Sequence, residues 1–123
     1  MKRDRFRRLV AQALDSIPAR FRRKMANIAV VVEDWPPVDV LEEMGIEDPC
    51  ELLGLYRGVP LDEREAAFAG SLPDHIAIYQ GPIEALSEEA AEVREIIRDT
   101  VIHEVGHYFG LSDEEIERLT SED

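Results

Sequence analysis

The chain has 123 residues, with 14 Lys and Arg against 27 Asp and Glu, and so a formal net charge of −13. This length fits one compact domain, which we expect to span residues 1–123. Hydrophobic residues make up 45% and charged residues 33%, a globular composition. No apolar run approaches the ~18 residues that a membrane helix needs, and no apolar stretch follows the basic N-terminus as in a secretory signal. We therefore expect a cytoplasmic protein with no membrane contact. The single cysteine, Cys50, excludes an internal disulfide and a cysteine-based zinc cluster.

The charge is unevenly distributed along the chain. Residues 1–24 carry nine basic and two acidic side chains, whereas residues 25–123 carry five basic and twenty-five acidic ones. An acidic surface repels phosphate backbones, so we expect no nucleic-acid partner. The favoured interpretation of the basic segment is a surface helix whose arginines lie against the chain's own acidic side chains. The alternative is a docking site for an acidic partner.

The first third of the chain predicts two helices and a strand. Apolar residues recur every three or four positions over residues 4–17, which predicts an amphipathic helix. Pro18 is expected to open a short second helix that runs toward Met25. The β-branched run 28–32 predicts a buried strand, which the two prolines at 36–37 end.

The middle of the chain gives weaker signals. Residues 38–51 predict a loop with one helical turn, residues 52–58 a short strand, and residues 62–70 a loop or weak helical turn. Residues 74–80 follow Pro73 and alternate apolar with polar positions. This alternation predicts a half-buried strand at an edge of the sheet.

The longest helical pattern lies near the C-terminus. It begins at Ser87, which we expect to be the N-cap, and continues for about six turns. Gly110 is expected to end it, because glycine adopts the left-handed conformation that helix ends often need. Residues 112–115 then have the capping-box pattern, which predicts a short last helix with Ile116 and Leu119 facing inward.

The long helix carries His103-Glu104-Val105-Gly106-His107, an H-E-x-x-H motif. Four residues rotate a helix by about 400°, so the two imidazoles project from nearly one face and can both reach a Zn²⁺ at about 2.0–2.1 Å. Glu104 is rotated by about 100° from His103, which puts its carboxylate beside the metal. There it can take a proton from water, the general-base role in metal-assisted hydrolysis. The alternative interpretation is two helix histidines without a metal.

Beyond the motif the pattern continues with Gly110 and Asp113, which gives H-E-x-x-H-x-x-G-x-x-D. This string resembles the extended signature of the zincin metallopeptidases, in the variant with an aspartate in place of the third histidine. Together with the N-terminal helix and the segments 27–36, 52–61 and 74–82, nearly the whole chain resembles a small bacterial family of zincin-like, minimal metallopeptidases. The resemblance implies an α+β fold in which helices pack on a small mixed sheet. It also implies that the motif helix forms the floor of a cleft.

The resemblance further implies a role for each residue of the motif. His103, His107 and Asp113 would hold Zn²⁺, and Glu104 would be the general base that activates water toward a peptide bond of a peptide or protein substrate. In zincins the strand before the motif helix commonly pairs with extended substrate, so residues 75–80 would take that part here.

The residues themselves leave the third ligand open. Asp113 also fits the first turn of its own helix, where the helix dipole favours acids. Glu114 and Glu117 are weaker candidates, and water beside two protein ligands is a further alternative. The Met-turn of the metzincins is missing, because every methionine lies upstream of the motif. A zinc-dependent peptidase is the favoured hypothesis. The alternatives are a metal-binding interaction or regulatory domain without proteolytic activity, and a structural acidic adaptor with a chance motif.

Other polar side chains are weaker candidates for the site. Tyr56, Tyr79 and Tyr108 each carry a hydroxyl that can stabilise an oxyanion, although a packed tyrosine with a satisfied hydroxyl is the more common case. His75 is expected on the exposed face of its strand and away from zinc.

Overall fold

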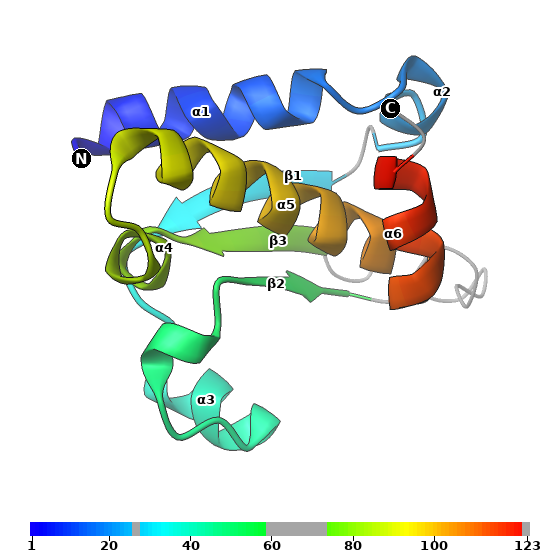
Figure 1. The fold of residues 1–123 in the computed structure, drawn as a ribbon. Coiled ribbons are helices and arrows are strands. Elements are labelled where there is room, and N and C mark those ends of the chain that lie inside the picture. The colour runs from blue at the N-terminus through cyan, green and yellow to red at the C-terminus, as the bar shows by residue number, and fades with distance from the viewer. Residues whose placement is uncertain (26–27, 59–73, 122–123) are drawn as a thin grey trace.

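The computed structural model describes residues 1–25, 28–58 and 74–121, and the segment 62–70 lies outside these residues. Six helices and three strands make up the described part of the chain (Figure 1). The helices are α1 (Arg3–Asp15), α2 (Ala19–Arg22), α3 (Val38–Met44), α4 (Gln80–Leu86), α5 (Ala90–Tyr108) and α6 (Asp113–Ser121). The strands are β1 (Ile28–Glu33), β2 (Gly54–Arg57) and β3 (Asp74–Tyr79).

The strands form one mixed sheet in the order β1-β3-β2. β1 runs parallel to β3, with Val30 opposite Ile76, and β2 runs antiparallel to it, with Leu55 opposite Ala77. The predicted edge position of strand 74–80 is therefore wrong, because β3 has a neighbour on each side. A strand is present at 28–32, but the prediction that it is buried is wrong. β1 is the first strand in the order β1-β3-β2, and its residues alternate between half-buried and exposed.

The main hydrophobic core lies between the sheet and two helices. Figure 1 shows α1 and α5 running along each other over one side of the sheet. The prediction for residues 4–17 is confirmed, because the apolar stripe of α1 is buried in this core. The buried members of the core are Phe6, Leu9, Val10, Ala13, Ile17, Ile76, Ile78, Ile83, Val93, Ile97, Val101 and Val105.

A smaller apolar cluster covers the opposite face of the sheet. It contains Val40, Leu41, Leu52, Ala77 and Tyr79, and so joins α3 to β3. Residues 38–51 contain more helix than the one turn predicted. α3 has seven residues, and one turn of 3-10 helix follows it at 49–51.

The long helix begins later than the sequence predicts. α5 starts at Ala90 with Glu89 as its N-cap residue, whereas Ser87 ends α4 and donates its hydroxyl to the carbonyl of Ile83. No helix was expected over residues 81–86, and Pro82 lies in the first turn of α4. The missing N–H of Pro82 would have had no partner there in any case.

The basic side chains near the N-terminus face solvent. Arg3 pairs with Asp34, and within the described part of the chain this is the one ion pair that a basic side chain of residues 1–24 makes with an acidic side chain. Arg5, Arg7 and Arg8 are exposed. Among the described acids, the interpretation that the basic segment lies against the chain's own acidic side chains therefore fits Arg3 alone. No helix among the described residues is long and apolar enough to cross a membrane.

Candidate metal centre

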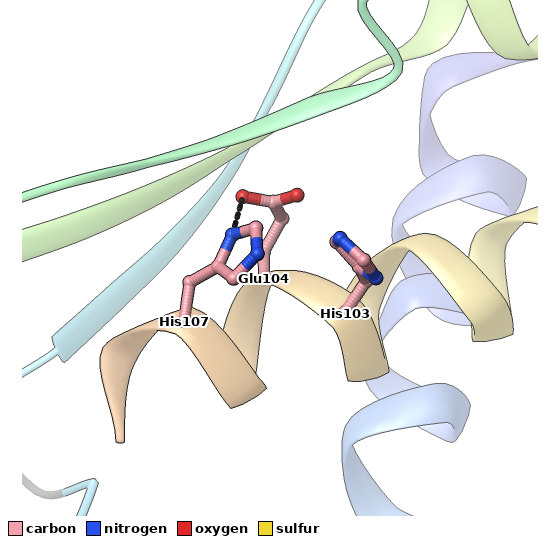
Figure 2. Close-up of side chains that lie close together, drawn as sticks. All are labelled: His103, Glu104 and His107. Carbon is pink, nitrogen blue, oxygen red and sulfur yellow. Dashed lines mark ion pairs between the residues drawn. The ribbon is translucent and has the colours of Figure 1, made fainter. Parts of the chain in front are cut away.

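The H-E-x-x-H motif lies in the last two turns of α5, where the core fixes its orientation. Val101 and Val105 are buried beneath the helix, so the two histidines point outward and remain about 40% exposed. The ring centroids of His103 and His107 are 4.5 Å apart. Figure 2 shows both rings on the same side of the helix, as the four-residue spacing predicts.

Glu104 points from the same helix toward β2, and only 9% of its side chain is exposed. The backbone N–H of Tyr56 donates a hydrogen bond of 2.9 Å to Oε1 of Glu104. The same oxygen lies 3.4 Å from Nδ1 of His107, the contact drawn dashed in Figure 2. Within the described residues Oε2 has no hydrogen-bond partner, and Figure 2 shows it on the His103 side of the carboxylate.

The chain reverses after α5 through a left-handed turn at Gly110, whose φ is 75°. The N–H of Gly110 donates to the carbonyl of His107, and the N–H of Leu111 donates to that of Gly106, both at 3.0 Å. This pair of bonds is the Schellman motif, which requires a residue that tolerates positive φ. The prediction that Gly110 ends the helix is confirmed, and the turn sends the chain back over the motif.

α6 begins with the predicted capping box and packs on the end of α5. The N–H of Glu115 donates to the hydroxyl of Ser112 at 3.2 Å, and the Ser112 hydroxyl donates to the Glu115 carboxylate at 3.1 Å. Ile116 is buried, as predicted, while the side chain of Leu119 lies outside the described part. A Cβ on Gly106 would lie 2.4 Å from Ile116. The glycine inside the motif therefore lets the two helices approach, a role that the sequence pattern did not suggest.

The turn and the capping box bring Asp113 to the two histidines. Its Oδ1 lies 3.1 Å from Nε2 of His103 and 3.5 Å from Nε2 of His107. Ligand atoms bonded at about 2.0–2.1 Å in a tetrahedral zinc site lie about 3.3 Å from one another, so these separations match those around one ion. Glu114 instead lies 3.5 Å from Arg118.

His103, Glu104 and His107 also form a group that could hold a metal ion, with one ligand atom from each residue within 4.8 Å of the others. Two carboxylates, those of Glu104 and Asp113, therefore lie beside the histidine pair. They differ in burial, because the side chain of Asp113 is 74% exposed and that of Glu104 is almost fully buried.

A groove of about 510 Å³ opens beside these residues. One wall is the motif face of α5 and the other is β2 with the segment that precedes it. The groove is lined by Met44, Glu51, Leu52, Leu53, Gly54, Leu55, Tyr56, Asp99, Thr100, His103, Glu104 and His107.

The strand edge that faces the groove belongs to β2. The N–H of Tyr79 donates to the carbonyl of Leu53 at 2.9 Å, so by antiparallel alternation the backbone groups of Gly54 and Tyr56 point away from β3. The Tyr56 bond to Glu104 agrees with this direction. The expectation that residues 75–80 pair with an extended substrate is therefore wrong, because β3 is already paired with β1 and β2.

The remaining polar candidates do not meet at the histidines. The Tyr108 hydroxyl donates to the carbonyl of Lys24 and the Tyr56 hydroxyl to the carboxylate of Asp74, both at 3.2 Å. Tyr79 is almost fully buried, and burial is the main cause that raises the pKa of its phenol. His75 is half-buried and lines an adjoining pocket with Arg57 and Glu43.

Comparison with known proteins agrees with this architecture. A family model described as zincin-like metallopeptidase matches residues 25–122. A solved structure of a conserved hypothetical protein from Thermus thermophilus is similar, with 25% identity and a TM-score of 0.57, and the match covers 99% of this chain and 100% of that one. No curated protein sequence matches the chain. Since the family model spans most of the chain and the fold is the expected α+β arrangement, this protein belongs to the zincin-like metallopeptidase family.

Proposed function

We propose that the protein is a zinc-dependent peptidase. In this proposal His103, His107 and Asp113 hold the metal, and Glu104 is the general base. The proposal is carried by the meeting of both histidine Nε2 atoms with one oxygen of Asp113, in a chain of a metallopeptidase family. Imidazole nitrogens and a carboxylate are a donor set that zinc prefers, and three protein ligands leave a fourth position open for catalysis.

The orientation of the rings favours Asp113 over Glu104 as the third ligand. Nε2 of His107 faces Asp113, whereas Glu104 lies on the Nδ1 side of that ring. A metal shared by the two Nε2 atoms is therefore reached by Asp113 more directly. Oε1 of Glu104 is in addition already engaged by the Tyr56 amide.

Each residue then has a separate task in hydrolysis. A bound zinc ion would act as a Lewis acid and lower the pKa of a bound water toward neutral pH. Glu104 would accept a proton from the attacking water through Oε2, while the Tyr56 N–H holds Oε1. At the outward edge of β2 the Tyr56 N–H is already bonded to Glu104, so main-chain pairing with an extended peptide would use the backbone groups of Gly54.

A metal-binding domain without proteolytic activity is the second candidate, and one observation favours it. Among the described tyrosines, Tyr56 and Tyr108 already donate their hydroxyls to other groups and Tyr79 is buried. The described tyrosines therefore offer no free hydroxyl to stabilise an oxyanion.

The test compares the wild type with Glu104→Gln in zinc content and in turnover of a broad peptide pool. We expect near-stoichiometric zinc in both proteins and a loss of about 10²–10⁴-fold in hydrolysis by the variant, the usual contribution of a general base. Glu88→Gln, which changes an exposed acid ahead of α5, is the matched charge control. A wild type that binds zinc but cleaves nothing favours the second candidate. A wild type that binds no zinc refutes both.

A further inference from the structure

We infer that Gly54 is a positioning residue for Glu104. The absence of a side chain at Gly54 lets β2 lie directly against α5, and this approach brings the Tyr56 N–H onto the carboxylate. The inference rests on the proposed function in so far as it calls Glu104 the general base.

The glycine is needed for space and not for backbone conformation. Gly54 is buried in an extended strand and is not among the glycines with positive φ. A Cβ there would lie 2.7 Å from Cγ2 of Thr100 and 3.2 Å from both Cγ of Glu104 and the carbonyl oxygen of Ala77. Thr100 cannot rotate away without losing the 2.7 Å bond from its hydroxyl to the carbonyl of Ile96. Any larger residue would therefore push β2 away from α5.

The effect would reach Glu104 through Tyr56, two residues further along β2. The N–H of Tyr56 points away from β3 and donates to Oε1 at 2.9 Å. The Tyr56 side chain is fixed independently of Glu104. Its ring packs edge-on against Tyr108, with the ring centroids 5.8 Å apart, and its hydroxyl donates a hydrogen bond to Asp74. A displaced strand would stretch the hydrogen bond from the Tyr56 N–H to Glu104, and the nearly buried carboxylate would lose a backbone donor that fixes its rotation.

A glycine that serves packing alone makes a different prediction from a glycine that positions the base. Poor packing lowers the melting temperature and leaves the turnover of the folded protein unchanged. Poor positioning lowers kcat while the zinc content stays the same, because the metal is held by other groups. Misplacement of a catalytic group by about 1 Å can cost about 10²-fold in rate.

The experiment uses Gly54→Ala, Thr100→Ser and the double variant, each loaded with zinc. Gly54→Ala is expected to lower kcat by about 10–100-fold. The double variant removes the Thr100 methyl group that the new Cβ meets first, and should recover most of that loss relative to Thr100→Ser. A double variant as slow as Gly54→Ala would overturn the inference, as would a loss of zinc that parallels the loss of rate.

A second readout does not depend on activity. The amide hydrogen of Tyr56 should exchange slowly in the wild type, faster in Glu104→Ala and Gly54→Ala, and slowly again in the double variant. This measurement holds even if the wild type cleaves no peptide, so a failure of the proposed function is seen separately. If Gly54→Ala does not fold, the test uses Glu104→Ala alone. Unchanged exchange of the Tyr56 amide in that variant would refute the hydrogen bond between Tyr56 and Glu104, and with it the inference.

Discussion

The zinc affinities of Asp113→Asn and Glu104→Gln decide which carboxylate is the third metal ligand. Both substitutions keep the size of the side chain and remove its charge. Asp113 faces the Nε2 atoms of both histidines, at 3.1 and 3.5 Å, whereas Glu104 faces Nδ1 of His107 at 3.4 Å. We therefore expect Asp113→Asn to weaken zinc binding strongly and Glu104→Gln to change it little.

The size of the effect follows from the share that one ligand contributes. Four-ligand structural zinc sites bind with about 10–16 kcal/mol at pH 7, or about 3 kcal/mol per ligand. A loss of that size raises Kd by about 10²-fold. Because the Asp113 side chain is 74% exposed, water can replace it in part, and we expect a rise of about 10–100-fold.

The assay is competition for zinc against a chromophoric chelator of known affinity. Glu114→Gln is the matched control, since Glu114 is the next residue on α6 and lies beside Arg118 instead of the histidines. If Glu104→Gln loses more affinity than Asp113→Asn, Glu104 is the ligand. The assignment of Glu104 as general base would then be refuted.

Three further predictions concern α6, acid stability and substrate charge. Gly106→Ala should destabilise the protein by about 1–3 kcal/mol, the usual cost of overpacking, which thermal unfolding measures. It should also weaken zinc binding in the chelator assay, because the new Cβ displaces α6. Burial opposes ionisation of Glu84, but hydrogen bonds from Gln80 and the amino-terminal ammonium outweigh it and lower the pKa below 4.5. A depressed carboxyl pKa adds stability that is present at neutral pH and is lost as the pH falls through the folded value, so Gln80→Leu should shrink the difference in urea midpoint between pH 7 and pH 3. Asp99 lines the groove and makes no ion pair within the described residues, so Asp99→Asn should raise KM for arginine-containing peptides by about two- to fivefold at low salt. Equal KM values for Asp99→Asn and the control Glu88→Gln would contradict this last prediction.

Local patterns predicted the parts of the protein whose causes are local. The amphipathic stripe of α1, the turn at Gly110 and the capping box at Ser112 each depend on residues within a few helical turns, and each is confirmed. The positions of the strands in the sheet depend on which distant segments pair, and both the edge position predicted for 74–80 and the buried position predicted for 28–32 were wrong.

The site shows the same division between local and distant causes. The helical spacing of His103 and His107 was sufficient to place both rings on one face. The contact between the Tyr56 amide and Glu104 joins residues 48 positions apart, and no periodicity in either segment indicates it. The close approach at Gly54 is hidden for the same reason, since its cause lies in Thr100 on another element.

The packing of Ile116 against Gly106 has a thermodynamic consequence for the C-terminal helix. The same two helices also meet at the proposed metal position. There Asp113 of α6 lies beside the two histidines of α5. Metal binding and the docking of α6 are therefore linked, and each must strengthen the other by the same free energy. Chelation would remove the metal's share of the contact between α6 and α5, so the helix should undock before the rest of the fold unfolds. In the metal-free protein, cleavage by trypsin at Arg118 would report that undocking directly.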